Sequence, residues 1–422
     1  MNKTSLKIAI TTLSILLLSV SPIFAWGQSH PRAMGMAGAY TALGNGFEAT
    51  AYNPANLGLS NNRSFSLDLV GFGLSLKNNS FSLADYNKYT GQFLDNDDKQ
   101  DILNRIPSEG LKLNLLTEAN AMSFSVNRVA LSFRTLGASK LNLDKDPFEL
   151  FLYGNAVKSE VNLSDTKGEA YAIGDAALSY GHPLKKWDRG EFAIGATAHF
   201  FYGAAYQKII RAEGGVYTTD DGFEGDGTML IKSCLGGQGY GLDLGAAMIF
   251  EQNWVFSASW QNVYSNINWN GDPEEILYTF EMTEPINFDN MSDDDSDSLV
   301  ESNDTTYDVE AFSTKLPSVL KLGLARTYKN MVWSVDWEQG LDYSASQGVT
   351  PRISAGLEYS PLSFIPLRVG TSFGGDLGNR FSTGFGLYMG PYKIDFAVAN
   401  NGSFDPNSTK GLDFGFAMGL KF

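Results

Sequence analysis

The chain ends in Leu412-Asp413-Phe414-Gly415-Phe416-Ala417-Met418-Gly419-Leu420-Lys421-Phe422. Side chains alternate between the two faces of a strand, so every second residue of this stretch shares a face. One face is large and apolar, and it carries Leu412, Phe414, Phe416, Met418, Leu420 and Phe422. The opposite face is small or charged, with Asp413, Gly415, Ala417, Gly419 and Lys421. The stretch therefore predicts a strand whose two faces meet very different surroundings.

The same contrast recurs through most of the chain. Segments that alternate in this way begin at residues 121, 129, 192, 242, 254, 320, 353, 381 and 392. A soluble sandwich also alternates, but it rarely sets Gly and charge so regularly opposite Phe and Leu. A transmembrane barrel does so, because one face meets lipid and the other meets a polar lumen. Closure also removes the edge strands that a long sheet would expose. The pattern predicts an all-β protein, a transmembrane antiparallel β-barrel.

The lengths of the connections give an independent test of this prediction. Expected long connections fall at residues 78–109, 144–167, 204–237, 263–315, 341–350, 374–379 and 400–410. Expected short ones fall at residues 127–128, 182–189, 251–252, 328–330, 361–365 and 390–391. Long and short connections alternate strictly, which predicts about 14 strands with both ends of the barrel on the short-turn side. The long connections would be external and the short ones periplasmic.

The first 25 residues have the parts of a secretory signal peptide. Lys3 and Lys7 form a basic start, residues 8–20 are largely apolar, and Ala25 provides a small residue before Trp26. A membrane-anchor helix is the alternative, but the apolar core is too short to favour it. We expect residues 1–25 to be removed, which leaves an exported chain.

Composition excludes several classes of function. The formal net charge is −16, so nucleic acid is not an expected partner because its phosphates would be repelled. The chain has one Cys, Cys234, and three His, which is little material for a metal, cofactor or acid–base site. His199, expected to face the lumen with Glu191, has no nucleophile motif beside it, so no catalytic residue, cofactor or metal is expected.

Residues 26–62 have a composition of their own. Ala33, Met34, Met36 and Tyr40 lie in a run of small residues that suits close packing in a narrow space. A Tyr52-Asn53-Pro54 turn follows, in which Pro54 fixes its own φ and keeps Asn53 out of the helical region. An ordinary Gly/Pro-rich loop is the alternative interpretation.

The Met-Gly-x-Ala-Gly-Ala-Tyr run followed by Tyr-Asn-Pro-Ala resembles the N-terminal hatch of the FadL-type outer-membrane family. The terminal aromatic strand, residues 412–422, resembles the strand by which the barrel-assembly machinery recognises such proteins. One departure is Asn56, where the usual motif has Gly. The resemblance implies a plug at residues 26–62 inside a barrel formed by residues 63–422, in the outer membrane of a Gram-negative bacterium.

The resemblance also implies passive transport of a hydrophobic small molecule, such as a long-chain fatty acid or a hydrocarbon. PorV-type binding of secreted proteins is the alternative function.

Two expected long loops carry helical signals. Residues 97–106 form one, and Asp146-Pro147 starts a second that contains Phe148, Phe151 and Leu152. These apolar side chains either pack against the neighbouring loop or, as the resemblance implies, offer a landing site for the ligand at the outer mouth. The acidic runs at residues 220–227 and 289–304 lack the spacing of a calcium loop and are expected to be solvated.

Two further sets of residues are expected on opposite sides of the barrel wall. Inward charges that would hold the plug or meet the polar end of a ligand are Arg134, Glu191, Asp243, Lys321, Arg352, Glu358, Arg368, Lys393 and Asp395. Aromatic residues that would form girdles at the membrane interfaces are Trp254, Trp260, Trp269, Trp333, Trp337, Tyr359 and Tyr392.

Overall fold

The computed structural model describes residues 30–153, 160–251, 253–286, 299–342, 344–346, 348–375 and 378–421. The expected signal peptide and Phe422 lie outside the described residues, as does most of the acidic run at 289–304. Among the residues that are described, no helix is both long and apolar enough to cross a membrane.

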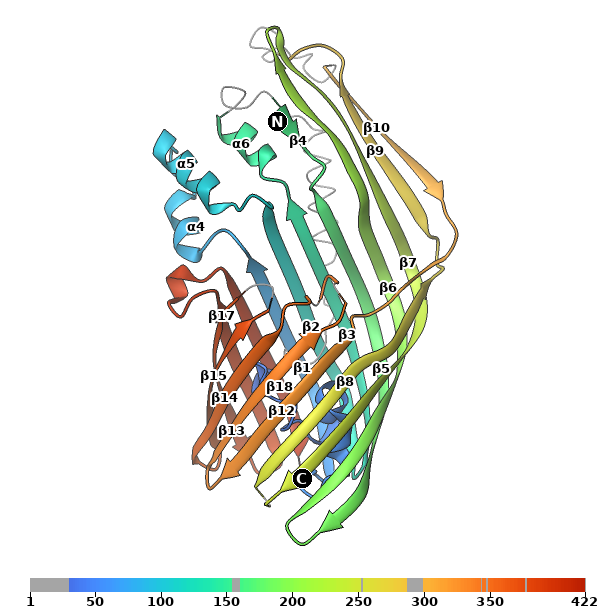
Figure 1. Ribbon diagram of the computed structural model, residues 1–422, viewed down its shortest axis with the longest axis vertical. Helices are drawn as coiled ribbons and strands as arrows, with labels where there is room; N and C mark the ends of the chain where they lie inside the picture. Colours follow the sequence, from blue (N-terminus) through green and yellow to red (C-terminus); the bar gives the residue numbers. More distant parts are fainter. Residues whose placement is uncertain are drawn as a thin grey trace.

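Helices are few and short, and most of the described chain is strand (Figure 1). The helices are α2 (Pro31–Met34), η1 (Gly46–Glu48), α3 (Ala49–Tyr52), η2 (Pro54–Gly58), α4 (Leu83–Tyr89), α5 (Asn96–Arg105), α6 (Asp146–Tyr153) and η5 (Pro406–Ser408). The strands of the first half are β1 (Phe65–Asn78), β2 (Leu111–Val126), β3 (Val129–Leu143), β4 (Glu160–Asn162), β5 (Lys167–Trp187), β6 (Gly190–Thr219), β7 (Gly222–Phe250), β8 (Trp254–Trp269) and β9 (Glu274–Met282). The strands of the second half are β10 (Val300–Asp308), β11 (Phe312–Thr314), β12 (Val319–Tyr328), β13 (Met331–Gly340), β14 (Arg352–Leu362), β15 (Ile365–Gly374), β16 (Arg380–Met389), β17 (Tyr392–Asn401) and β18 (Gly411–Lys421).

The strands close into an antiparallel barrel of 14 strands, as predicted. The barrel consists of β1–β3, β5–β8 and β12–β18, and each strand pairs with its neighbour in this order. The seam is the pairing of β1 with β18, in which Phe72 lies opposite Phe416 and Leu74 opposite Phe414. The last strand therefore completes the cylinder by pairing with the first.

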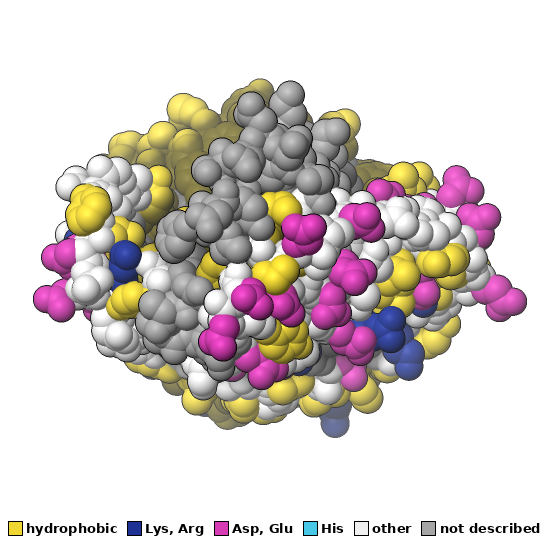
Figure 2. Space-filling view, turned by 90° about the horizontal axis from the view of Figure 1, so that it is seen from above, with side chains coloured by type: hydrophobic (Ala, Val, Ile, Leu, Met, Phe, Trp, Pro, Cys, Tyr) yellow, Lys and Arg dark blue, Asp and Glu magenta, His cyan; other side chains and the backbone are white. Residues whose placement is uncertain are grey.

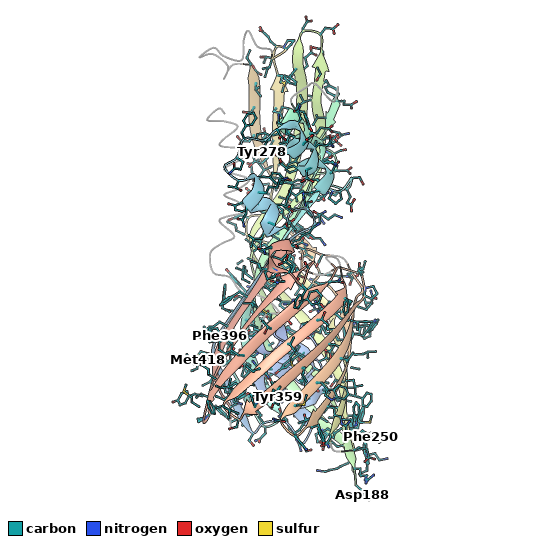
Figure 3. The ribbon with its side chains drawn as sticks, turned by 90° about the vertical axis from the view of Figure 1, so that its left-hand side faces the viewer. Asp188, Phe250, Tyr278, Tyr359, Phe396 and Met418 are labelled. Atoms are coloured by element: carbon teal, nitrogen blue, oxygen red, sulfur yellow. The ribbon has the colours of Figure 1, made fainter. Side chains whose placement is uncertain are left out.

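The two faces of the terminal strand point as the alternation predicts. Leu412 and Phe414 are 50% and 43% exposed on the outside, whereas Asp413 and Lys421 are 2% and 8% exposed inside. Figure 3 shows Phe396 and Met418 on the outer wall of the barrel. A closed barrel whose outer face is apolar and whose inner face is polar is the β-structure that spans an outer membrane. The protein is therefore an outer-membrane β-barrel.

Two expected long loops are wrong in detail, because strands continue through them. Residues 204–237 belong to β6 and β7, which extend as one hairpin to its tip at residues 220–221. In the expected loop 263–315, β8 continues to Trp269, and β9 and β10 follow as a second hairpin. With β4 these strands form an external sheet, β4-β6-β7-β9-β10, which rises above the barrel in Figure 1 and carries Tyr278 in Figure 3. Above the membrane both faces of a strand meet protein or water, so the apolar contrast that marks lipid-facing strands is lost.

The expected helices of the external loops are present. Asp95 caps α5, and its side chain accepts a hydrogen bond from Asp98 N–H. Helix α6 covers the predicted Phe148, Phe151 and Leu152. Seen from above, acidic side chains outnumber basic ones over the external loops (Figure 2).

Candidate functional site

The N-terminal segment lies inside the barrel as the predicted plug. Its expected packing residues Ala33, Met34, Met36, Tyr40 and Tyr52 are each at most 2% exposed. The rings of Tyr40 and Tyr52 meet edge to face, with centroids 4.9 Å apart. Small residues between these side chains let the backbone turn tightly. The plug is therefore a compact body with a core of its own.

The Asn53-Pro54 turn connects the plug to the barrel wall. Asn53 is extended (φ −159°, ψ 110°), as the following proline requires, and its Oδ1 accepts a hydrogen bond from Ala55 N–H at 2.9 Å. Its Nδ2 donates to the carbonyl oxygens of Ala246 and Ala258, at 3.0 and 3.1 Å. One buried amide thus caps η2 and also bonds to β7 and β8.

The unusual Asn56 has a structural role of its own. Its Nδ2 donates to the carbonyl oxygens of Thr41 and Gly44, at 2.9 and 2.7 Å. Its Oδ1 accepts a hydrogen bond from the Ser257 hydroxyl in β8 at 2.9 Å. A glycine at this position could make none of these bonds, so here Asn56 ties the two halves of the plug together.

We expect Asn53→Ala to destabilise the plugged barrel by about 2–4 kcal/mol, because buried partners are left without their hydrogen bonds. Denaturant unfolding of the detergent-solubilised protein, followed by tryptophan fluorescence, measures this loss. Asn407→Ala, at an exposed position of η5, is the control and should change stability by less than about 0.5 kcal/mol. Equal stability of the two variants would contradict the role given to Asn53.

Six inward-facing glycines of the wall form a socket for the plug. A Cβ atom built on any of them would lie 2.0–2.9 Å from a plug atom, closer than real Cβ contacts. They come from six strands on different sides of the lumen: Gly181, Gly195, Gly245, Gly323, Gly356 and Gly370. The socket explains why glycine recurs opposite large outward residues: the wall leaves room for the plug backbone.

Charged groups hold the plug where the socket does not. Arg32 forms an ion pair with Glu358 of β14 at 2.8 Å, and Glu358 also contacts Arg368 of β15 at 2.7 Å. The N–H groups of Tyr40 and Thr41 both donate to one carboxylate oxygen of Asp336, at 3.0 and 2.7 Å. All these groups come from the plug or the inner wall, so the plug is bonded to the second half of the barrel as well as to the first.

The plug also bridges the seam between the first and last strands. Phe47 N–H donates to the Ser66 hydroxyl of β1 at 3.0 Å, and the neighbouring Glu48 carboxylate pairs with Lys421 of β18. Burial raises the pKa of Glu48, but Lys421, His30 and Arg32 lower it by more, so this pKa lies well below its usual range. Glu48 is therefore ionised at neutral pH and pairs with the strand that closes the barrel.

A cavity of about 180 Å³ lies in the lumen beside the plug and reaches the connections at residues 316–319 and 345–350. One part of its lining is apolar and consists of Leu115, Leu116, Leu136, Leu316, Pro317, Val319 and Ala345. Leu136, Leu316 and Ala345 continue into a buried apolar cluster that includes Phe201 and Trp269. A cavity of this size can hold a benzene-sized ring.

The rest of the cavity lining is mostly polar or glycine and includes five cationic side chains. Its basic residues are Lys77, Lys140, Lys321, Arg352 and Arg380, and among the described residues of the lining Glu338 is the one carboxylate. Glu338 pairs with Lys321 at 3.3 Å and with Arg352 at 3.0 Å. Asp413, just behind the lining, pairs with Arg380 at 2.7 Å. The described part of the lining therefore brings five basic side chains close to the apolar residues.

A second, smaller space separates the plug from the wall at β2 and β3. It measures about 20 Å³ and borders Ala51, which also lines the larger cavity. Here β2 bulges: its pairing with β3 skips residues 121–123, and Met122 has φ 56°. Ser123 Oγ accepts a hydrogen bond from Phe133 N–H at 3.1 Å. This side chain takes the place of a backbone acceptor that the bulge moves out of register. Gly137 does not interrupt β3, since it pairs with both neighbouring strands.

The structure separates the predicted site residues into two groups. Ala33, Met34, Met36, Tyr40, Tyr52, Asn53 and Pro54 are together in the plug. Helix α6 lies outside the lumen against α5, where Tyr153 donates to the Asn96 carbonyl at 3.2 Å. Phe148, Phe151 and Leu152 do not line the cavity, and Phe151 is 86% exposed. Whether this exposed residue receives a ligand stays a prediction.

The predicted lumen charges also lie in two places, some against the plug and others around the cavity. Glu191, Glu358 and Arg368 contact the plug, whereas Lys321 and Arg352 line the cavity. Sequence reasoning missed the cavity residues Lys77, Lys140 and Arg380. The signal for Lys77 was present, because it continues the inward series Gly71, Gly73 and Ser75 of β1.

His199 is a buried structural residue. Its ring lies 3.0 Å from Asp175 and 3.1 Å from Asp243, and Arg134 pairs with Asp175 at 2.6 Å. Glu191, elsewhere on the inner wall, accepts a hydrogen bond from Ser60 N–H of the plug. Within the described part of the chain, no cluster of His, Cys, Asp and Glu could hold a metal ion.

Taken together, the closed barrel, the N-terminal plug and the cavity beside it define a plugged outer-membrane β-barrel. The chain belongs to DUF5723, a family of unknown function, whose model matches residues 54–233 and 210–401.

Solved structures with this fold include the toluene transporter TbuX of Ralstonia pickettii, at 15% identity and a TM-score of 0.53, with 93% of this chain and 98% of that chain covered. The toluene transporter TodX of P. putida matches at 11% identity and a TM-score of 0.52, covering 95% and 99%. A FadL homologue of Pseudomonas aeruginosa matches at 12% identity and a TM-score of 0.51, covering 95% and 100%. Comparison with the curated proteins found no match.

Proposed function

We propose that this protein admits hydrophobic small molecules through the outer membrane, and that its preferred ligands carry an anionic group on a ring-sized apolar body. The cavity carries this proposal, because apolar residues line one part of it and five cations another. An apolar body buries its surface against Leu116, Leu136 and Leu316, and a carboxylate meets the cations. The toluene transporters TbuX and TodX, which share this fold, support the apolar half of the proposal.

The plug makes such passage selective. Socket glycines and ion pairs hold the plug against the wall on several sides. The plug therefore blocks the passage of water and ions through the lumen. A ligand moves on only if its binding energy displaces side chains beside the plug. The smaller space at the β2 bulge lies between the cavity and the lipid, but about 20 Å³ holds no more than a water molecule. Passage to the membrane by this route therefore requires the bulge or a plug side chain to move.

Uptake of two probes by cells that make the protein tests the proposal. Toluene is the neutral probe and benzoate is the anionic probe of similar ring size. Lys321→Met should lower benzoate uptake about tenfold, because a hydrogen bond to a charged group is lost, and should leave toluene uptake within about twofold. Lys232→Met, in the external sheet, is the matched control and should leave both rates unchanged.

Two outcomes would count against the proposal. If neither probe enters faster than into cells without the protein, the transport function is wrong. If toluene enters, but benzoate does not and Lys321→Met has no effect, the preference for an anionic group is wrong and only transport of neutral hydrocarbons stands.

Binding of secreted proteins is the second candidate function. The external sheet favours it, because this sheet rises above the mouth and its strand β10 pairs only with β9 among the described strands. A pull-down from detergent extract, with and without the β9–β10 hairpin, distinguishes the two functions. Recognition of residues 412–422 by the barrel-assembly machinery also stays a proposal.

A further inference from the structure

A groove of about 410 Å³ opens at the short-turn end of the barrel, on the opposite side of the plug from the ligand cavity. We call it the short-turn groove. Its lining comes from the end of the plug, the β2–β3 turn and the β5–β6 hairpin: Leu57, Gly58, Leu59, Ser60, Asn62, Arg63, Ser64, Asn127, Arg128, Pro183, Leu184, Lys185, Lys186 and Glu191. The hairpin extends beyond the other turns, as the position of Asp188 in Figure 3 shows.

Four cations and one carboxylate line the short-turn groove. Arg128, Lys185 and Lys186 are exposed, and among the described residues no carboxylate lies within ion-pair distance of any of them. The single carboxylate, Glu191, already accepts a hydrogen bond from Ser60 N–H. The groove is therefore a positive site, although the protein as a whole has a net charge of −16.

The plug closes the short-turn groove toward the ligand cavity. Helix η2 packs against β5 and β6 so closely that a Cβ on Gly181 would lie 2.4 Å from Gly58 N, and one on Gly195 would lie 2.4 Å from the Pro54 carbonyl carbon. No passage of ligand size runs between these backbones. An occupant of the groove therefore comes from the membrane or from the periplasm, not from the lumen.

Apolar outward residues begin directly beside the cations. Val126 and Val129 flank the turn that carries Arg128, and Leu184 precedes Lys185; these three apolar side chains are 47%, 44% and 52% exposed. On the outer face of the barrel such residues meet lipid chains. The surface is thus apolar where acyl chains lie and cationic where their headgroups lie, which matches a lipid better than a polypeptide or a free anion.

We propose that the short-turn groove binds the phosphate headgroup of an anionic phospholipid from the adjoining leaflet. Arg128, Lys185 and Lys186 contact the headgroup, and the acyl chains lie along Val126, Val129 and Leu184. Basic pockets at the ends of membrane-spanning segments bind anionic headgroups in this way. Because Ser60 and Asn62 of the plug line the same groove, the bound lipid connects the end of the plug to the wall.

The test is native mass spectrometry of the full-length protein, released from micelles that contain phosphatidylglycerol or phosphatidylcholine. The wild-type protein should retain phosphatidylglycerol in preference to phosphatidylcholine. Each removed charge should weaken retention about fivefold, so the combined variant Arg128→Gln, Lys185→Gln and Lys186→Gln should lose it. Lys186→Gln is compared with Arg189→Gln, which removes the same charge from the same hairpin outside the groove and should leave retention unchanged.

Four results would overturn the proposal. These are equal retention by the combined variant, equal retention of the two lipids, a loss on Arg189→Gln as large as that on Lys186→Gln, and displacement of phosphatidylglycerol by equimolar inorganic phosphate or polyglutamate. The last result would assign the groove to a free anion or an acidic polypeptide. The substituted side chains are exposed, and heat modifiability on gels confirms that each variant is folded.

Discussion

Gly195→Ala should displace the plug from its position against the wall, although the substitution adds only one methyl group. The new Cβ would lie 2.4 Å from the Pro54 carbonyl carbon and 2.5 Å from Ala55 N. Both are backbone atoms, so no flexible side chain can move aside to make room. Overpacking of this kind costs about 1–3 kcal/mol, and here displacement of η2 would also break the Asn53 hydrogen bonds to the wall. We therefore expect the plug to leave its socket while the barrel stays closed.

Limited trypsin digestion of the folded protein in detergent measures this change. The Arg32 side chain is only 12% exposed in the wild-type plug and should resist cleavage, whereas in Gly195→Ala it should be cut at least tenfold faster. Gly174→Ala is the matched control, because its Cβ would meet no atom closer than 3.8 Å. Equal cleavage rates at Arg32 in the two variants would show that close packing at Gly195 does not hold the plug.

The sequence indicates the barrel because the membrane imposes a rule on every spanning strand. In β18 each outward residue is large and apolar and each inward residue is small or charged, and this rule needs no knowledge of neighbouring strands. The same alternating pattern predicts only part of the glycine socket. Inward glycines such as Gly195 and Gly370 were visible as small residues, but which plug atom each one faces depends on the fold of residues 30–62.

Other features depend on surroundings that a local pattern does not record. Trp269 was expected in an interfacial girdle, but it is 1% exposed in an internal cluster, where its indole N–H donates to Thr314 at 2.8 Å. Since β8 runs on past the membrane, Trp269 meets protein rather than lipid headgroups. The cations of the cavity were missed for a similar reason: Lys77 and Arg380 come from opposite halves of the chain and meet only because the barrel closes.

Glu358→Gln should cost more stability than the loss of any surface ion pair. Glu358 is 6% exposed and accepts hydrogen bonds from Arg32 of the plug and Arg368 of the wall, at 2.8 and 2.7 Å. Gln has nearly the same shape, so the substitution removes charge without leaving a cavity. Two buried guanidinium groups then lose their shared carboxylate, and breaking a buried pair in this way costs about 3–5 kcal/mol.

Denaturant unfolding of the detergent-solubilised variants tests the prediction. Glu251→Gln is the control, because Glu251 pairs with Arg189 at an exposed turn and an exposed pair contributes about 0–1 kcal/mol. The double variant Arg32→Gln with Glu358→Gln should lose less stability than the sum of the two single variants, since the second substitution removes a charge that the first left unpaired. Strictly additive losses would mean that Arg32 and Glu358 do not stabilise each other, and that the plug is held by its other contacts with the wall.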